Sequence, residues 1–321
     1  MYGLPAMAKP LAYNATLVER IDLTSALAIF KVRPDEALED EPPFLPGQYV
    51  TLGLNNDKTP ELGSVRRPMS IASAPEERDA LEFYIRYVSH PESDNPLTHL
   101  LWETRASDRM FLRAKAVGKF TVTDTVGTAD TRLRVCVAAG TGLAPFVSFV
   151  RSDVLRQPDA DLGGYAILHG ASYPDDLGYR DEIERLVAQN GLIYAKSISR
   201  PHEASGWDGD TGRVEDYFQA DRLAATERQL GLEPGGLRPD RAVIFICGLQ
   251  GTIGKTITRL IGRGFVPDNK KLRRVLEVPE AIAPSLFFEQ YDATPVIDVK
   301  DPAVVEPLRS DLAAALANIL R

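Results

Sequence analysis

The chain has 321 residues, of which 44% are hydrophobic and 26% charged, and its formal net charge at pH 7 is -8. This length suits two domains, and the composition is that of an ordinary globular protein. The negative charge argues against nucleic-acid binding, and no apolar run reaches the roughly 20 residues of a membrane helix. The first residues lack a basic region followed by an apolar one, so we expect no signal peptide and a cytoplasmic location.

The first part of the chain is predicted to form short strands separated by turns containing proline or glycine. A single helix is expected to begin near Pro96. Many short strands with little helical periodicity predict an antiparallel β-barrel or sandwich. The predicted strands cover residues 27–32, 48–54, 69–73, 80–88, 109–114 and 119–123.

A polar link at residues 124–131 is followed by apolar strands that alternate with amphipathic helices. This alternation predicts a doubly wound α/β domain, in which helices cover both faces of a parallel sheet. We expect a β-barrel domain to end near residue 128, an α/β domain at 129–294, and an extension at 295–321 with a strand and a helix. The α/β strands are expected at 133–139, 164–172, 192–199 and 242–248, and the helices at 146–156, 180–189, 214–229 and 253–263.

Cysteine and histidine residues lack the number and spacing of a metal site. An iron–sulfur cluster usually needs four thiolates, whereas the chain has two cysteines, Cys136 and Cys247, each within an apolar run. We expect no metal, and we interpret Cys136 as a buried small hydrophobic residue. Of the four histidines, His169 ends an apolar run and is expected to be structural.

The stretch from Phe245 to Thr256, FICGLQGTIGKT, ends like a phosphate-binding P-loop. A P-loop has four residues between its first glycine and the Gly-Lys-Ser/Thr group, which would require glycine at position 249. That position is Leu249, and neither Gly248 nor Gly251 has the correct spacing. The sequence therefore argues against an ATP site here.

Gly140-Thr141-Gly142 connects a predicted strand to a predicted helix whose first turn contains Pro145. The N-terminus of a helix attracts a pyrophosphate, and glycine lets the backbone approach it closely. The turn lies at the carboxyl edge of a parallel sheet, where such folds bind ligands. Alone it is also compatible with an ordinary tight turn, because the third glycine of the dinucleotide fingerprint is absent.

Arg67 and Ser70 lie three residues apart in a strand that contains Pro68, which is typical of an edge strand. A guanidinium binds phosphate through two hydrogen bonds, and a serine hydroxyl reaches a polar ring atom. An ordinary exposed arginine is the simpler interpretation of this strand taken alone. Thr98 likewise either caps a helix near a phosphate or only caps the helix.

Taken together, the order of these motifs resembles the ferredoxin–NADP⁺ reductase family, from about Ala15 to Tyr291. The motifs are Arg67-to-Ser70 in a barrel, the helix at Leu97-Thr98, the Gly140–Gly142 turn and a strand that ends in Cys247-Gly248. The nearest resemblance is to the bacterial ferredoxin/flavodoxin–NADP⁺ reductases. It implies FAD in the barrel domain, NADP(H) in the α/β domain, and hydride transfer between them.

The resemblance also implies roles for residues near FAD. Arg67 would bind the pyrophosphate, and Ser70 would hydrogen-bond near flavin N5. Met69 stands where the family usually has an aromatic residue stacked on the flavin, and its thioether can cover a ring face. The other implied FAD contacts are Pro68, Tyr84, Ile85, Arg86, Leu97, Thr98 and Thr141.

Tyr291 corresponds to the aromatic residue that covers the other flavin face near the C-terminus of the family. Here thirty residues follow it. Such a ring must move aside for nicotinamide, and packing between the two domains is the alternative interpretation of this residue. Ser70, Cys247 and Tyr291 are the expected catalytic residues.

The nicotinamide cofactor would lie over Gly140, Thr141, Gly142, Cys247 and Gly248. Discrimination in favour of NADPH requires cations near the 2′-phosphate, because an unpaired phosphate oxygen is costly to desolvate. The segments that match the family there contain Ser199, Arg200 and Arg213, whereas Ser172 stands where a third arginine is common. These residues favour NADPH over NADH.

Ferredoxin and flavodoxin, the expected partners, are usually acidic, so a basic docking face is expected. Residues 255–274 carry seven basic residues and one acid, although such a run is also typical of a solvated face. Alternatives for the function are the reductase component of an oxygenase, a flavin reductase, or a redox-inactive nucleotide-binding regulatory subunit. The docking candidates are Lys255, Arg259, Arg263, Lys270, Lys271, Arg273 and Arg274.

Overall fold

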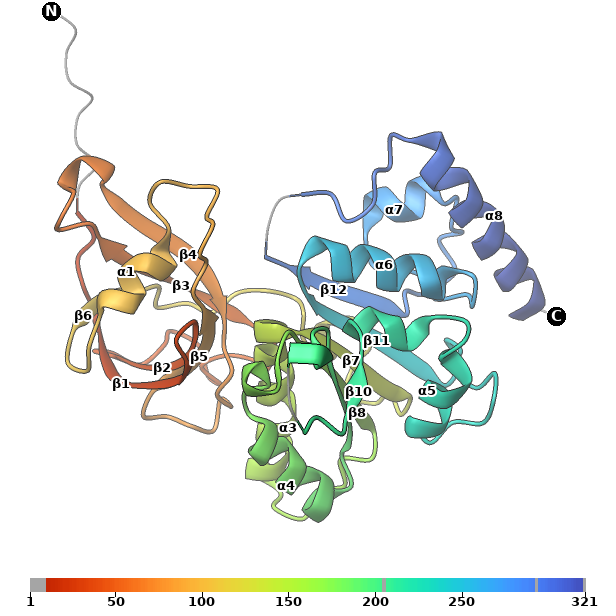
Figure 1. Cartoon of the computed structure of the whole chain (residues 1–321), viewed down its shortest axis with the longest axis horizontal. Helices are drawn as coiled ribbons and strands as arrows, with labels where there is room; N and C mark the ends of the chain where they lie inside the picture. Colours follow the sequence, from red (N-terminus) through yellow and green to blue (C-terminus); the bar gives the residue numbers. More distant parts are fainter. Residues whose placement is uncertain (1–9, 204–205, 292–293, 320–321) are drawn as a thin grey trace, which may run out of the picture. The chain divides into compact units, whose positions relative to one another are not determined.

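The computed structural model describes residues 10–203, 206–291 and 294–319 (Figure 1). The chain divides into two compact units, which are described separately. Unit 1 consists of the residues up to Thr121 together with Ala144–Arg156, and unit 2 consists of Val122–Leu143 and the residues from Gln157 onward. Within the described residues, no helix has both the length and the apolar character needed to cross a membrane.

Unit 1 contains an antiparallel sheet of six strands in the order β4-β3-β6-β1-β2-β5. The two outer strands meet, because the backbone N–H of Ala72, just after β4, donates to the carbonyl of Glu82 in β5 at 2.8 Å. This contact closes the sheet into the predicted barrel. The strands are β1 (Ala15–Thr24), β2 (Leu27–Pro34), β3 (Tyr49–Asn55), β4 (Ser64–Ser70), β5 (Leu81–Arg86) and β6 (Arg109–Leu112).

Two expected strands of unit 1 differ from the structure. The strand expected at 69–73 begins at Ser64, because residues 64–70 pair with β3. It ends at Ser70, since the backbone N–H of Ala72 already donates to Glu82 of β5. The segment expected as a strand at 119–123 instead leads into the short helix α2 (Val122–Thr125). Gly118, with φ +117°, precedes it. This backbone turn interrupts the extended conformation.

Helix α3 (Ala144–Arg156), which follows the Gly140–Gly142 turn, belongs to unit 1. The Ser148 hydroxyl donates to the carbonyl of Ser73 at 2.7 Å, and Arg151 pairs with the buried Glu82 at 2.8 Å. Apolar contacts add to this, since Phe146 of α3 packs on Phe120. Helix α1 (Leu97–Glu103) also belongs to unit 1, and its side chains Leu97 and Leu101 are buried.

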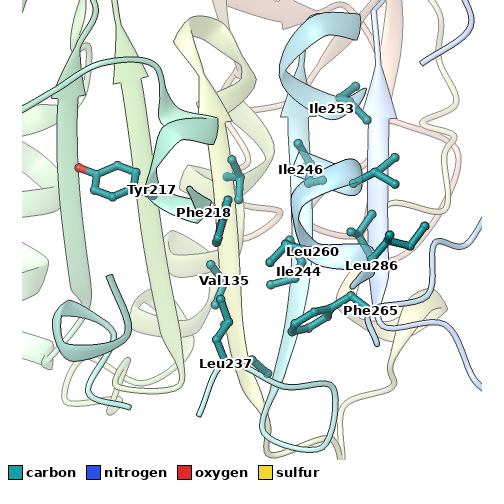
Figure 2. Packing of buried hydrophobic residues seen from close by; sticks show 14 of the residues in the cluster. Val135, Tyr217, Phe218, Leu237, Ile244, Ile246, Ile253, Leu260, Phe265 and Leu286 are labelled. Carbon is teal, nitrogen blue, oxygen red and sulfur yellow. The ribbon is translucent and has the colours of Figure 1, made fainter. Parts of the chain in front are cut away.

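Unit 2 contains a parallel sheet of six strands in the order β10-β9-β8-β7-β11-β12, as expected for the α/β domain. Ile253 and Leu260 of α6 pack with Ile244 and Ile246 of β11 in a buried apolar cluster (Figure 2). The strands are β7 (Leu133–Ala139), β8 (Tyr165–Ala171), β9 (Ile193–Ile198), β10 (Asp210–Thr211), β11 (Ala242–Gly248) and β12 (Leu286–Gln290). The helices are α4 (Arg180–Asn190), α5 (Leu223–Gln229), α6 (Gln250–Ile261), α7 (Lys270–Val275) and α8 (Pro302–Ile319).

The helix expected at 214–229 is interrupted. A 3₁₀ turn at Val214–Phe218 ends at Gln219, whose backbone is extended with ψ 147°, and α5 begins only at Leu223. The side chain of Asp216 caps the start of this turn, because it accepts a hydrogen bond from the backbone of Arg213, and it also accepts one from the side chain of Gln219. The extended backbone at Gln219 separates the turn from α5.

The C-terminal segment packs into unit 2. Its side chains Ile297, Leu308 and Leu312 are buried within the same apolar cluster as the sheet. The described residues after 293 form α8 but not the expected strand, since Pro295 and Pro302 lie in the connection and the chain there crosses α6 instead of pairing with β12. The extension is therefore part of the hydrophobic core of unit 2.

Candidate functional site

The glycine turn and the end of β11 are in direct contact in unit 2. Strands β7 and β11 are neighbours, with Cys247 in register with Ala138. A Cβ on Gly142 would lie 2.0 Å from the carbonyl oxygen of Cys247, so no other residue fits there without movement of the backbone. Gly140 begins this 3₁₀ turn, and α3 starts at Ala144, so Pro145 occupies the first helical turn as predicted.

Tyr291 joins these two segments. Its hydroxyl donates to the carbonyl of Thr141 at 3.2 Å and accepts a hydrogen bond from the thiol of Cys247, also at 3.2 Å. Cys247 is fully buried, whereas Tyr291 is 42% exposed. The structure therefore brings together Thr141, Gly142, Cys247 and Tyr291, which the sequence assigned to one site from three separate motifs.

The thiol of Cys247 is a poor nucleophile. Burial raises its pKa well above the usual value, the carboxylate of Glu289 adds to the shift, and the hydrogen bond with Tyr291 opposes it. The thiol therefore stays protonated at neutral pH. Its contribution is to shape and polarity at the end of β11, not to covalent catalysis.

His169 lies in β8, the other neighbour of β7, and it is buried as expected for a structural residue. Its Nδ1 is 3.2 Å from the hydroxyl of Tyr194. Burial lowers the pKa of His169 to about 3, and an interaction with the backbone of Gly140 opposes the shift. The ring is therefore neutral at physiological pH.

The residues expected near a 2′-phosphate lie at the same carboxyl edge of the sheet. Ser199 and Arg200 directly follow β9, and Arg213 comes two residues after β10. Three strand spacings of about 4.8 Å separate β9 from β11, so the carboxyl ends of these two strands lie roughly 14 Å apart along the edge. Such a separation suits an extended dinucleotide.

Arg200 is held by an aromatic residue that the sequence analysis missed. Its guanidinium lies over the ring of Tyr173, 5.3 Å from the centroid, and its Nη1 donates to the Tyr173 hydroxyl at 2.6 Å. That hydroxyl donates in turn to Glu203 at 2.7 Å. Tyr173 directly follows Ser172, which stands where the family often has a third arginine. The missing arginine was the one sequence signal that could have drawn attention to Tyr173.

In unit 1, the predicted flavin-binding strand is β4, and it occupies the edge of the sheet as expected. Arg67 and Pro68 are exposed, Met69 is half-buried against the barrel core, and Ser70 is buried. Within the described residues, the hydrogen bond recorded for Arg67 is to the carbonyl of its neighbour Arg66, at 2.9 Å. Its guanidinium is thus not committed to an acidic side chain there.

The other predicted FAD contacts lie on elements next to β4. Tyr84 and Ile85 are buried in β5 and Arg86 is half-buried at its end. Leu97 and Thr98 begin α1, but the N-cap residue of that helix is Pro96, so Thr98 does not cap it. Its hydroxyl instead accepts a hydrogen bond from the backbone of Val88 at 3.4 Å.

The seven basic residues of the stretch 255–274 fall into two groups. Three of them form ion pairs within unit 2: Lys255 with Glu215 at 3.7 Å, Arg259 with Asp216 at 3.0 Å, and Arg263 with Glu227 at 2.7 Å. Arg273 donates to the backbone carbonyl of Ile282 at 2.7 Å. Lys255 is also exposed but belongs to the paired group, whereas Lys270, Lys271 and Arg274 are the exposed members on α7.

The Gly254-Lys255-Thr256 sequence lies in the middle of α6. A P-loop would place its glycines before the helix, so this segment does not have the backbone geometry of a P-loop. Leu249, the N-cap residue of α6, is 65% exposed beside Cys247-Gly248. The exposed Leu249 side chain adds apolar surface next to Cys247-Gly248, at a position that none of the sequence motifs includes.

Comparisons with known proteins identify related chains. The model of the oxidoreductase NAD-binding domain matches residues 136–256. The chain is 31% identical over 222 residues to ferredoxin–NADP reductase B of Sorangium cellulosum, covering 69% of this chain and 80% of that protein. It is 28% identical over 212 residues to the xylene/toluene monooxygenase electron transfer component of Pseudomonas putida, covering 65% of this chain and 54% of that protein.

A solved structure has the same fold. It is a ferredoxin NADP⁺ reductase from Neisseria gonorrhoeae with bound FAD and NADP, with a TM-score of 0.67 and 21% sequence identity over 87% of this chain and 98% of that one. The resemblance inferred from the order of the motifs is thereby confirmed. This chain belongs to the ferredoxin–NADP⁺ reductase family.

Proposed function

We propose that the chain is a cytoplasmic, FAD-dependent oxidoreductase that transfers electrons between NADPH and ferredoxin or flavodoxin. Bound FAD would supply the chemistry, since a flavin accepts a hydride and releases single electrons. The observation that carries the proposal is the contact of Gly142 with Cys247 beneath the hydroxyl of Tyr291, at the carboxyl edge of the unit 2 sheet.

The residues of unit 2 fit a nicotinamide cofactor. A Cβ on Gly142 would fill the space against Cys247, so the turn keeps its backbone close to the strand end. Arg200 and Arg213 are exposed at the same edge of the sheet and provide two cations for a 2′-phosphate. In this proposal Thr141, Cys247 and Gly248 orient the nicotinamide, while Ser199 and the two arginines bind the phosphate end.

The residues of unit 1 fit a flavin dinucleotide. Arg67 presents an exposed guanidinium from the edge strand β4, where it can bind a pyrophosphate through two hydrogen bonds. Met69 offers a thioether for one ring face, and Ser70 offers a hydroxyl three residues from Arg67. The remaining predicted contacts, Pro68, Tyr84, Ile85, Arg86, Leu97 and Thr98, lie on β4, β5 and α1.

The purified protein tests this function directly. We expect it to be yellow, or to become so when FAD is added, and to lose its flavin absorbance when NADPH is added without oxygen. NADH in the same assay should bleach the flavin more slowly at equal concentration. A colourless protein that cannot be loaded with FAD would contradict the proposal and support a redox-inactive nucleotide-binding subunit.

The reductase component of an oxygenase is the second candidate, supported by the 28% identity to the monooxygenase electron transfer component. Both candidates predict a yellow protein that NADPH reduces. They differ in the acceptor, so the reduced protein should be offered a flavodoxin, a ferredoxin and an oxygenase component in parallel. Fastest reduction of the oxygenase component would favour the second candidate.

For the carrier, we propose that the docking face is the exposed basic surface of α7, formed by Lys270, Lys271 and Arg274. Residues 270 and 274 are one helical turn apart and share a face. Positive charge there attracts an acidic carrier and raises the rate of encounter. The ion pairs of Lys255, Arg259 and Arg263 reduce their contribution to this surface.

Reversing the charge at α7 should slow the reduction of the carrier. For Lys270→Glu/Lys271→Glu we expect a decrease of roughly tenfold or more at low salt, because steering contributes about 10–1,000-fold to association rates. Acidic residues suit the first turn of a helix, so α7 should remain folded. Stopped-flow rates at several salt concentrations measure the effect.

The matched control for this experiment is Arg185→Glu, an exposed charge reversal on α4. It should leave carrier reduction unchanged, and all variants should oxidise NADPH with a small dye at the wild-type rate. Equal losses with carrier and dye, or an equal effect of the control, would contradict docking at α7.

A further inference from the structure

Gly254 is the point at which the C-terminal segment crosses α6. A Cβ on Gly254 would lie 2.3 Å from the carbonyl oxygen of Val296, which is too close for any side chain. One helical turn earlier, the amide of Gln250 donates to the carbonyls of Pro295 and Val296, at 3.2 and 3.4 Å. We call residues 294–300 the strap, and Gln250 and Gly254 are the residues of α6 that contact it.

The strap is fixed at its far end by α8. Ile297, Leu308 and Leu312 are buried in the core of unit 2. Arg309 donates to the carbonyl of Val275 at 3.0 Å and pairs with Glu277 at 3.1 Å. Release of the strap therefore requires exposure of apolar surface, which makes it a stable anchor for the chain that precedes it.

Tyr291 lies between this anchor and β12. On one side, Gln290 is the last residue of β12 and is in register with Gly248 of β11. On the other side, the strap begins at Thr294, whose carbonyl accepts a hydrogen bond from the side chain of Gln290. Tyr291 thus directly follows a residue paired with β11, and the described chain after it resumes at residue 294 with the strap, within one compact unit.

We infer that the strap positions Tyr291, so that its hydroxyl stays against Cys247 and Thr141 and the ring resists displacement. Gly254 and Gln250 are positioning residues in this arrangement, acting through the strap on Tyr291. Only the identity of the ligand that displaces the ring, an aromatic nicotinamide, rests on the proposed function. The positioning itself is a property of unit 2 and is testable without any cofactor.

The test uses two glycines of the same helix. Gly254→Ala places a methyl group against Val296, whereas a Cβ on Gly251 meets nothing within 4 Å. Both substitutions exchange glycine for alanine within α6, so Gly251→Ala is the control for a methyl group that does not meet the strap. The readout is the rate at which N-ethylmaleimide modifies Cys247 in the folded full-length protein, measured by peptide mass spectrometry.

We expect Gly254→Ala to speed modification of Cys247 by roughly tenfold or more, because looser contact with Tyr291 uncovers a buried thiol. Gly251→Ala should match the wild type, and Cys136, which is also fully buried, should remain unmodified in all variants. Gln250→Ala removes the two hydrogen bonds from the side-chain amide to the strap and adds no atom that clashes with it. It should also speed modification of Cys247, which keeps the test available if Gly254→Ala fails to fold.

Tyr291→Phe shows whether the effect passes through Tyr291. It removes both hydroxyl hydrogen bonds and should itself speed modification of Cys247, and Gly254→Ala should then add little, since coupled sites are not additive. Equal modification in Gly254→Ala, Gln250→Ala and the wild type would overturn the inference, as would full additivity with Tyr291→Phe. A failure to bind FAD or NADPH would instead count against the proposed function and would leave this result standing.

Discussion

Replacing Glu227 by alanine should lower the stability of unit 2 by about 3–5 kcal/mol, the range for removing one partner of a buried ion pair. Glu227 is 2% exposed and accepts hydrogen bonds from the backbone of Gly235 at 2.7 Å and of Leu237 at 3.1 Å. Arg263 adds a third contact at 2.7 Å. The substitution leaves two backbone N–H groups without their acceptor and Arg263 without its carboxylate, although its Nε still donates to the carbonyl of Leu237 at 2.9 Å.

Native-state hydrogen exchange of the β11 amides measures this loss, because β11 is fully buried and pairs with β7 on one side and β12 on the other. The matched control is Glu233→Ala, an exposed glutamate in the following loop, for which we expect a change within about 0.5 kcal/mol. Arg263→Ala should also destabilise the unit, and the two changes should be non-additive. Equal effects of Glu227→Ala and Glu233→Ala would contradict a stabilising role for the pair.

This pair changes the interpretation of the basic stretch. In the sequence, Arg263 is one of seven basic residues in a run, and only the spacing of these charges along the chain is visible. The structure pairs it with an acid 36 residues away. Ion pairs between distant segments depend on tertiary packing, so a local excess of charge overestimates the charge that is free to meet a partner.

The fold class was predictable because it depends on local patterns. Short strands with turn residues predicted the barrel, and apolar strands alternating with helices predicted the parallel sheet. The errors occurred where the backbone changes its conformation or its hydrogen-bond partner. The extended backbone at Gln219 interrupts the helix expected at 214–229, and the strand expected at 69–73 is displaced because Ala72 pairs with β5 and not with β3.

The site was predictable only in part. The order of the motifs indicated that Thr141, Gly142, Cys247 and Tyr291 belong together, and the structure places them in contact. The role of Gly254 was not predictable, because the carbonyl that requires a glycine there belongs to a residue 42 positions later. Roles in binding FAD and NADPH remain predictions for the residues named.

Arg200→Ala should raise the Michaelis constant for NADPH by roughly 10–100-fold, as expected for loss of a charge-assisted hydrogen bond to phosphate. NADH lacks the 2′-phosphate, so its constant should change little. The guanidinium is already oriented by Tyr173, which lowers the entropy lost when it binds a ligand. Steady-state kinetics with a dye acceptor, run with both cofactors, measure the effect.

The argument for Arg200 depends on geometry as well as charge. Arg200→Lys keeps the cation but loses the planar group that lies over the ring of Tyr173, so it should recover only part of the preference for NADPH. Tyr173→Phe keeps the ring and removes the hydroxyl, and should cause a smaller loss than Arg200→Ala. The control is Arg185→Ala, an exposed arginine on α4 that should behave as wild type. An equal loss with NADH would mean that Arg200 supports the folding of this edge and does not recognise the 2′-phosphate, since only the phosphate distinguishes the two cofactors.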